Sequence, residues 1–200
     1  MLTRLVVLIS GAGSNLVDLL ERCEQQPESN LAVVAVGSDR DASGLEHARA
    51  RGIPTFVVPF GNFASREQWG ERLIDAIESH APDRVVLSGF MKLLPPAVVR
   101  RFSPGMINTH PAYLPEFPGA HAVVDQIRAG VEQAGASVIA VDDGVDTGPI
   151  LARQRVAVEP SDTVEALHDR IKIAERQLLW QVLTEADSVA AVPRGGEHSR

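Results

Sequence analysis

The sequence predicts an α/β fold: a three-layer, doubly wound and mostly parallel sheet whose N-terminal half is Rossmann-like. Two observations predict this class. Short apolar runs rich in valine, isoleucine and leucine alternate with segments of helical periodicity, which is the order of elements in parallel sheets built from strand–helix–strand units. The first apolar run, residues 5–9, is continuous rather than alternating, as expected of a strand buried on both faces.

The first half of the chain alternates between strand and helix throughout. Apolar residues in the helical segments recur three and four positions apart, and Gly52 ends the second of these segments. The expected strands are residues 5–9, 31–36, 55–58, 84–87 and 106–109. The expected helices begin with one that starts directly after the first glycine loop and continue with residues 44–51, 65–80 and 95–102.

The second half of the chain is less regular. We expect helices at residues 120–129 and 163–183, and strands of alternating character at 136–141 and 151–158. Residues 142–149 between these strands are too rich in aspartate, glycine and proline to be regular. We expect one domain over residues 1–186 and a polar, partly disordered C-terminal tail over residues 187–200.

Composition narrows the class of protein. A chain of 200 residues can form one domain with a large core, and its net charge of -7 argues against sequence-independent binding of nucleic acid. No apolar run is long enough to span a membrane, and residues 1–4 lead directly into a strand rather than into a signal peptide. The single cysteine excludes a disulfide within the chain, so we expect a cytoplasmic protein. The spacing of histidines and carboxylates matches no metal site, and we expect no metal.

Residues 10–15 form a glycine-rich loop between the first strand and the first helix. Backbone N–H groups at a helix N-terminus attract anions, and Gly11 and Gly13 would let an anion come close. Leu16 stands where the dinucleotide-binding fingerprint has its third glycine, and the P-loop lysine is absent. The loop therefore fits a small phosphate group better than NAD or ATP. The plainer interpretation is a tight turn in which Ser14 or Asn15 caps the helix.

Residues 88–94 follow the fourth expected strand. Open α/β sheets bind ligands beyond the carboxyl ends of their strands, where Phe90, Met91, Leu93 and Leu94 could form the wall of a pocket for a flat aromatic ligand. The plainer interpretation of such an apolar run beside a buried strand is ordinary core.

Asn108 and His110 lie at the end of the fifth expected strand. Side chains two residues apart in a strand point to the same face, and Pro111 keeps His110 extended. The two polar groups could therefore share one reacting atom, although His110 could equally make a structural hydrogen bond in a polar loop.

The irregular segment 142–149 carries three aspartates. If Asp146 folds back onto His110, its carboxylate would orient the imidazole and stabilise the protonated ring. Otherwise these aspartates form turns or exposed hydrogen bonds. In the last helix, Lys172 and Glu175 share one side because they are three positions apart, and a surface ion pair is the plainer interpretation of them.

Together these segments resemble the phosphoribosylglycinamide formyltransferase family, the folate-dependent enzymes of purine biosynthesis. The Asn-x-His-Pro and Asp-x-Gly-Pro motifs are shared with other formyl-folate enzymes, whereas the glycine loop points to the glycinamide ribonucleotide branch. The matching segments run in family order through nearly the whole chain, at residues 8–15, 65–67, 88–91, 108–111, 114–115, 118–119 and 146–149 and at Glu175.

The resemblance implies the formyltransferase fold and a direct transfer reaction. The amine of glycinamide ribonucleotide would attack the formyl carbon of 10-formyltetrahydrofolate, the cosubstrate. Asn108 and protonated His110 would donate hydrogen bonds to the negative charge that develops on the formyl oxygen, and Asp146, with a bound water, would mediate proton transfer. The partners would be these small molecules, with no nucleic acid or membrane, and a homodimer stays open.

The resemblance also implies two sets of binding residues. Glycinamide ribonucleotide would be held by Gly13, Ser14, Asn15, Leu16, Val17, Lys172 and Glu175. The folate would be held by Arg66, Met91, Lys92, Leu93, Leu94, Asn108, Val141, Asp142 and Gly144. The Leu114–Pro115 peptide bond would be cis.

Two departures and several alternatives accompany this resemblance. The segment after Leu183 is short and polar, so we expect no C-terminal strand of the kind that relatives have. Tyr113 stands where the family more often has an apolar residue, so the loop after His110 could pack differently. Formyltetrahydrofolate hydrolase uses the same three catalytic residues with water as acceptor, but such enzymes usually carry an extra N-terminal domain. A methionyl-tRNA formyltransferase would need a basic C-terminal domain, and a non-catalytic phosphate-binding module would leave folate untouched.

Overall fold

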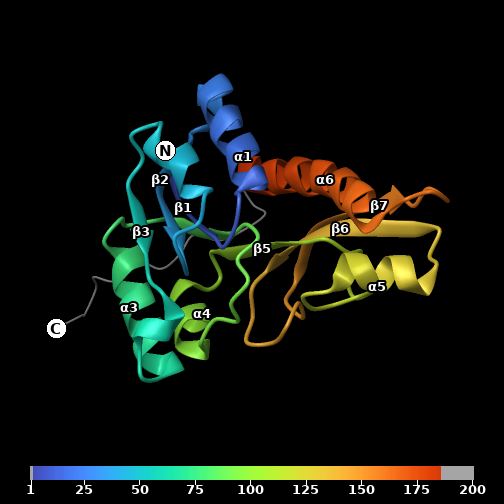
Figure 1. The fold of residues 1–200 in the computed structure, drawn as a ribbon. Helices are drawn as coiled ribbons and strands as arrows, with labels where there is room; N and C mark the ends of the chain where they lie inside the picture. Colours follow the sequence, from blue (N-terminus) through green and yellow to red (C-terminus); the bar gives the residue numbers. More distant parts are fainter. Residues whose placement is uncertain (1, 186–200) are drawn as a thin grey trace.

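The computed structural model describes residues 2–185 and forms a single seven-stranded sheet with helices on both faces (Figure 1). The expected tail, residues 187–200, lies outside the described residues. The strands are β1 (Thr3–Ile9), β2 (Leu31–Ser38), β3 (Thr55–Val57), β4 (Arg84–Leu87), β5 (Met106–His110), β6 (Gln133–Ala140) and β7 (Ile150–Ala157). The α-helices are α1 (Ser14–Gln25), α2 (Leu45–Arg49), α3 (Arg66–Glu78), α4 (Pro96–Phe102), α5 (Ala122–Ala129) and α6 (Val164–Thr184).

The strand order is β3-β2-β1-β4-β5-β6-β7, and it confirms the predicted fold class. The first five strands of this order pair in parallel, as the alternation of strands and helices predicts. β6 pairs antiparallel to both β5 and β7, so the sheet is mixed only at this edge. The carboxyl ends of β1, β4 and β5 consequently lie side by side at one edge of the parallel part.

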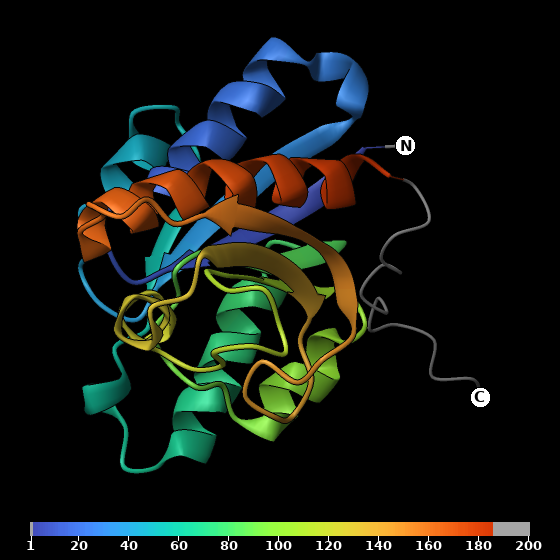
Figure 2. The ribbon, with the colours of Figure 1, turned by 90° about the vertical axis from the view of Figure 1, so that its right-hand side faces the viewer.

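Two apolar cores hold the three layers together, one on each face of the sheet. One core joins the sheet to α1, α2, α5 and α6, and the other joins its opposite face to α3 and α4. Figure 2 shows α1 and α6 together above the strands and the green helices below them. Residues 5–9 of β1 are completely buried between the two cores, which explains the continuous apolar run in the sequence.

The long helix α6 packs across the sheet through one apolar face. Its buried side chains include Leu167, Ile171, Ala174 and Leu178, as the helical spacing predicts. Glu175 interrupts this face: it is only 4% exposed, although it carries a carboxylate. A buried charge in an apolar stripe needs polar partners, and these lie in the site described below.

The remaining differences from the sequence prediction concern the ends of elements. β6 begins at Gln133, three residues before the expected start at 136, because its antiparallel pairing with β7 continues as far as Ala157. Two short 3₁₀ helices, Pro27–Ser29 and Phe60–Asn62, were not predicted, since single turns have no apolar period. The Leu114–Pro115 peptide bond is cis, as the resemblance implies. No helix within residues 2–185 is long and apolar enough to cross a membrane.

Packing over β2 predicts the effect of one added methyl group. A Cβ at Gly37 would lie 2.3 Å from the Phe56 ring and 2.7 Å from Leu8 Cδ2. We expect Gly37→Ala to lower the free energy of unfolding by about 2 kcal/mol, because overpacking a close-packed core forces its neighbours apart.

The matched control for this variant is Gly61→Ala, where an added Cβ meets no atom within 4 Å. We expect a change within about 0.5 kcal/mol there. Urea denaturation of the two variants compares them directly. Equal effects of the two substitutions would show that the β2 packing is not the cause.

Candidate active site

A cavity of about 590 Å³ opens beyond the carboxyl ends of β1, β4 and β5. Its walls come mainly from five segments that are distant in the sequence: the glycine loop, the loop after β4, the end of β5, the Asp-rich loop and one side of α6. The residues in its wall are 11–15, 87–94, Val99, 108–111, Gly119, Ala120, Ile139, 141–146, His168, Lys172 and Glu175. The structure thus gathers most of the predicted site residues around one space.

At the glycine end of the cavity, α1 begins at Ser14 directly after Gly13. Gly13 has a φ of 70°, in the left-handed region that favours glycine. No side chain caps the helix, so the plainer interpretation, in which Ser14 or Asn15 is the cap, is wrong. The uncapped N–H groups of the first turn lie at the cavity wall, where the positive end of the helix dipole favours an anion.

The Asn15 side chain connects this helix to α6. Its Nδ2 donates to Glu175 Oε2 at 3.2 Å, and its Oδ1 accepts from Arg176 Nε at 3.1 Å. The Thr109 side chain also hydrogen bonds to Glu175. Glu175 therefore has the polar partners that its burial requires, and they come from α1 and β5.

Burial raises the pKa of Glu175 to about 7, because the apolar surroundings disfavour the ionised carboxylate. The hydrogen bonds from Asn15 and Thr109 oppose this shift without cancelling it. Lys172 forms its ion pair with exposed Asp169, at 2.9 Å, rather than with Glu175. The plainer interpretation of Lys172 and Glu175 as a surface ion pair is therefore wrong, and both residues line the cavity.

The loop after β4 forms the apolar end of the cavity. Met91 is 69% exposed and Leu93 57%, so these two side chains present an open apolar surface. Leu94 is part of the core and Phe90 packs against it, as the plainer interpretation predicts. The Met91 N–H donates to Ser10 Oγ at 2.8 Å, which ties this loop to the end of β1. On the other side, Val141 and Asp142 complete the wall.

Three predicted residues do not line the cavity. Leu16 is completely buried in the core beneath α1, and Val17 lies in the first turns of that helix, where its N–H donates to the Gly13 carbonyl. Arg66 lies at the rim, where Nη1 donates to the Leu93 carbonyl and the guanidinium lies 5.3 Å from the centre of the Phe60 ring. Any contact of Leu16 with a ligand would therefore have to use its backbone.

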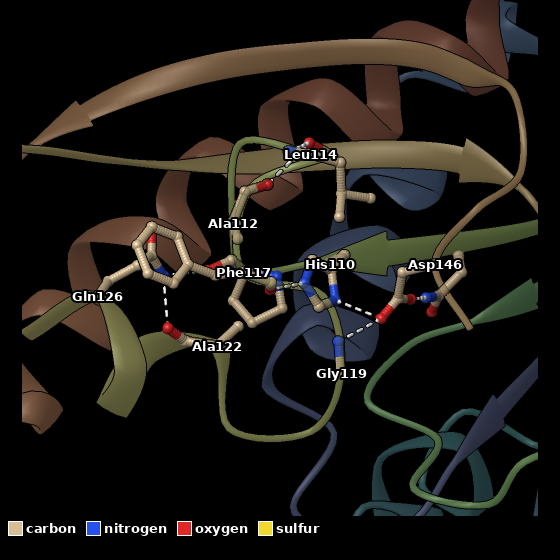
Figure 3. A network of polar contacts seen from close by, with 11 residues as sticks. His110, Ala112, Leu114, Phe117, Gly119, Ala122, Gln126 and Asp146 are labelled. Atoms are coloured by element: carbon tan, nitrogen blue, oxygen red, sulfur yellow. Dashed lines mark hydrogen bonds and ion pairs between the residues drawn. The ribbon is translucent and has the colours of Figure 1, made fainter. Parts of the chain in front are cut away.

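Asn108, His110 and Asp146 meet at the wall of this cavity. Figure 3 shows His110 and Asp146 facing each other, with Gly119 beside them. Asp146 Oδ2 lies 3.4 Å from His110 Nδ1 and accepts the Gly119 N–H at 2.8 Å. Asp146 Oδ1 lies 3.4 Å from Asn108 Nδ2. The Asp-rich loop therefore folds back onto His110, which was one of the two arrangements that the sequence allowed.

The second ring nitrogen of His110 is also engaged. Nε2 lies 2.9 Å from the carbonyl oxygen of Phe117, on the loop that follows β5. Both nitrogens thus face acceptors, and only the doubly protonated ring can donate to both. The side chain is 4% exposed, so the protein rather than solvent provides these partners.

Several residues of the site were not predicted from the sequence. The Phe117 carbonyl and the Gly119 N–H act through the backbone, which leaves no signal in side-chain identity. Thr109 faces away from Asn108 and His110 along the strand, toward Glu175. His168 could have been found, since it lies four residues before Lys172 and thus on the same side of α6.

Comparisons with known proteins agree with this geometry. Residues 3–183 match the family described as formyl transferase. The chain belongs to the formyl transferase family. This confirms the resemblance that the motifs indicate.

Among its relatives is a phosphoribosylglycinamide formyltransferase of Mycobacterium tuberculosis, which is 47% identical over 176 residues, covering 88% of this chain and 81% of the relative. The Escherichia coli protein of the same name is 37% identical, over 90% of this chain and 85% of its own. The crystal structure of glycinamide ribonucleotide transformylase 1 from Symbiobacterium toebii superposes with a TM-score of 0.88 at 32% identity, covering 96% of this chain and 95% of that one.

Family membership implies a formyl donor derived from folate. Within residues 2–185, no group of three or more histidine, cysteine, aspartate or glutamate side chains could hold a metal ion.

The raised pKa of Glu175 predicts a specific pH dependence of stability. Between pH 4.5 and about 7, the folded chain retains a proton that the unfolded chain has lost, so stability falls as pH rises through this window. The full effect is about 3 kcal/mol for a shift of this size. Glu175→Gln, which is neutral at every pH, should lack this decline.

Urea denaturation of both proteins at pH 5, 6, 7 and 8 measures this difference. We expect the free energy of unfolding of the wild type to fall, relative to that of Glu175→Gln, as the pH rises. Parallel curves for the two proteins would contradict the assignment of a raised pKa to Glu175.

Proposed function

We propose that this chain transfers the formyl group of 10-formyltetrahydrofolate to the amine of N1-(5-phosphoribosyl)glycinamide. The products are formylglycinamide ribonucleotide and tetrahydrofolate, in de novo purine (IMP) biosynthesis. One observation carries the proposal: a single cavity joins an uncapped helix N-terminus to an apolar loop, with Asn108, His110 and Asp146 between them. Relatives named phosphoribosylglycinamide formyltransferase favour this reaction over hydrolysis of the folate.

The phosphate of glycinamide ribonucleotide binds at the start of α1 in this proposal. Backbone N–H groups of Gly13, Ser14 and Asn15 donate to its oxygens, and Lys172 adds a positive charge from α6. Glu175 lies further into the cavity, where its carboxyl group meets the glycinamide or ribose end. The amine then extends toward His110.

The folate binds at the other end of the cavity. Its pterin lies between residues 91–94, which include Met91, Lys92, Leu93 and Leu94, and the Asp-rich side formed by Val141, Asp142 and Gly144. The exposed apolar surface of the first segment supports this placement, since a flat ring gains by covering it. Arg66, at the rim, approaches the glutamate of the folate.

The reacting groups meet at the three central side chains. The amine nitrogen attacks the formyl carbon, and the carbonyl electron pair moves onto the formyl oxygen. Asn108 Nδ2 and His110 Nδ1 donate to that oxygen, as preorganised donors stabilise a developing oxyanion. Both donors lie 3.4 Å from Asp146, which is a long hydrogen bond, so an entering formyl oxygen can compete for them.

Proton transfer completes the reaction. As the carbonyl re-forms, the bond to the folate nitrogen breaks, the attacking amine loses a proton and the folate nitrogen gains one. Asp146 mediates this transfer through a water molecule and orients the His110 ring. No residue forms a covalent bond with the formyl group, and the reaction needs no metal. A cytoplasmic location and the absence of nucleic acid and membrane partners stay predictions.

The direct test is acceptor-dependent formation of tetrahydrofolate. We expect the purified chain to convert 10-formyltetrahydrofolate only when glycinamide ribonucleotide is present. Turnover with the folate alone would identify the hydrolase instead. No turnover under either condition would contradict the proposed function.

Replacement of the central residues should abolish chemistry without unfolding the protein. We expect His110→Ala and Asp146→Ala to lower kcat by at least about 100-fold, because each removes a group that acts on the transition state. Steady-state kinetics and circular dichroism together check this. Near wild-type kcat in both variants would show that the roles are misassigned.

Replacement of Lys172 should affect only one substrate. We expect Lys172→Ala to raise KM for glycinamide ribonucleotide about 10-fold, because it removes a charge beside the phosphate, while KM for the folate stays within about twofold. A matched control is Lys92→Ala, at the folate end of the cavity. We expect this variant to change KM for the folate instead. Equal effects of Lys172→Ala on both KM values would argue against this division of the cavity.

A further inference from the structure

We propose that the loop after β5 is held in its catalytic position by a side-chain cluster on the exposed edge of the sheet. The cluster consists of Tyr113, Glu116, Arg153 and Arg155, and we refer to it as the tyrosine clamp. It rests on the proposed function, because it positions His110 for that reaction. None of its members touches the cavity, so all four are positioning residues.

The centre of the tyrosine clamp is the Tyr113 ring. The guanidinium carbons of Arg153 and Arg155 lie 4.2 Å and 3.8 Å from the ring centre. Cation–π contacts at such distances are favourable. Arg155 also forms a two-pronged ion pair with Glu116, at 2.7 Å and 2.5 Å, which is a geometry that restricts both partners.

Strand register places the clamp in line with the catalytic histidine. His110 on β5 is paired with Ser137 on β6, which in turn is paired with Arg153 on β7. Directly paired residues of antiparallel strands point to the same face of a sheet. The side chains of this row therefore all reach the loop that folds back over them.

Each member of the row contacts the loop. Ser137 Oγ accepts the Leu114 N–H at 3.0 Å and donates to the Ala112 carbonyl at 2.7 Å. Arg153 Nη1 donates to the Leu114 carbonyl at 2.6 Å. His110 meets the Phe117 carbonyl, and Figure 3 shows Ala112, Phe117 and Gly119 of this loop around the imidazole.

The next row of the sheet supports the tyrosine itself. Gly135 on β6 is paired with Arg155, and an added Cβ at Gly135 would lie 2.6 Å from Tyr113 Cβ. Tyr113 thus rests directly on the backbone of β6. The absence of a side chain at Gly135 is what allows the loop to lie this close to the sheet.

The far end of the loop contacts the catalytic residues. Its Phe117 carbonyl and Gly119 N–H are the backbone partners of His110 and Asp146. A single exposed ion pair contributes little to stability, so the clamp would be of small value as surface stabilisation alone. Its contacts instead fix residues 112–116, and through them the two backbone groups that orient the catalytic pair.

The first test compares Tyr113→Leu, which removes the ring, with Tyr113→Phe, which keeps the ring and loses only the hydroxyl. We expect Tyr113→Leu to lower kcat about 10-fold, with both KM values within about twofold, because displaced catalytic groups slow the chemical step. Tyr113→Phe should retain the wild-type kcat. Arg49→Ala, which breaks an exposed ion pair with Glu46 on α2, is the control for loss of a surface contact and should change nothing.

The second test needs no substrate. Nitrogen-15 NMR of the His110 ring, in the unliganded protein at one pH, reports the hydrogen bonds of Nδ1 and Nε2. We expect the Nε2 signal to shift in Tyr113→Leu and in Gly135→Ala, and to stay in place in Tyr113→Phe and Arg49→Ala. This test holds even if the chain does not turn over glycinamide ribonucleotide, so the two proposals can fail separately.

Several outcomes would overturn the proposal. Wild-type kcat and an unshifted His110 signal in Tyr113→Leu would show that the clamp does not position the histidine. Equal losses in the Leu and Phe variants would assign the effect to the hydroxyl rather than to the stacked ring. Failure of both Tyr113→Leu and Gly135→Ala to fold would show that the cluster maintains the fold and is no positioning device.

Discussion

The site depends on how the Asp146 carboxylate is held. Its backbone lies in the left-handed region, with a φ of 53°, which is uncommon for a residue other than glycine and is most tolerated by aspartate and asparagine. In that position the carboxylate accepts the Gly119 N–H at 2.8 Å and faces Asn108 and His110 at 3.4 Å. One side chain thus joins the Asp-rich loop, the loop after β5 and the end of β5 itself. Without it, the Asp-rich loop would lose its polar contacts with Asn108, His110 and Gly119 in the centre of the cavity.

The sheet explains why the two ends of the cavity differ. The parallel strands β1 and β4 end side by side, and the loop after each carries a different chemistry: uncapped N–H groups after β1 and an apolar surface after β4. β5, next to β4, ends with Asn108 and His110, so the reacting groups lie beside both loops. Helix α6 then closes the phosphate side with Lys172 and the buried Glu175. The antiparallel strands β6 and β7 line little of this cavity, and their side chains support the loop that orients His110 instead.

Much of this arrangement could be predicted from the sequence, because the spacing of apolar residues indicates the strands and helices and short motifs indicate the site. The continuous run at residues 5–9 predicted a doubly buried strand, and the alternation after it predicted the order of elements. The resemblance identified the family, and the structure brings together most of the predicted site residues. Backbone contacts could not be predicted: the Phe117 carbonyl, the Gly119 N–H and the uncapped helix have no signature in residue type. The partners of Glu175 were also hidden, since Asn15 and Thr109 meet it only after α1, β5 and α6 have packed.

A crystal structure of the chain with glycinamide ribonucleotide and a stable analogue of the formyl donor tests the central claim most directly. The predicted result places the phosphate at the start of α1. It places the oxygen that corresponds to the formyl oxygen within about 3 Å of both Asn108 Nδ2 and His110 Nδ1. Asp146 would then lie on the side of the attacking amine. A formyl group bound away from these two donors, or a phosphate bound at the loop after β4, would contradict the account.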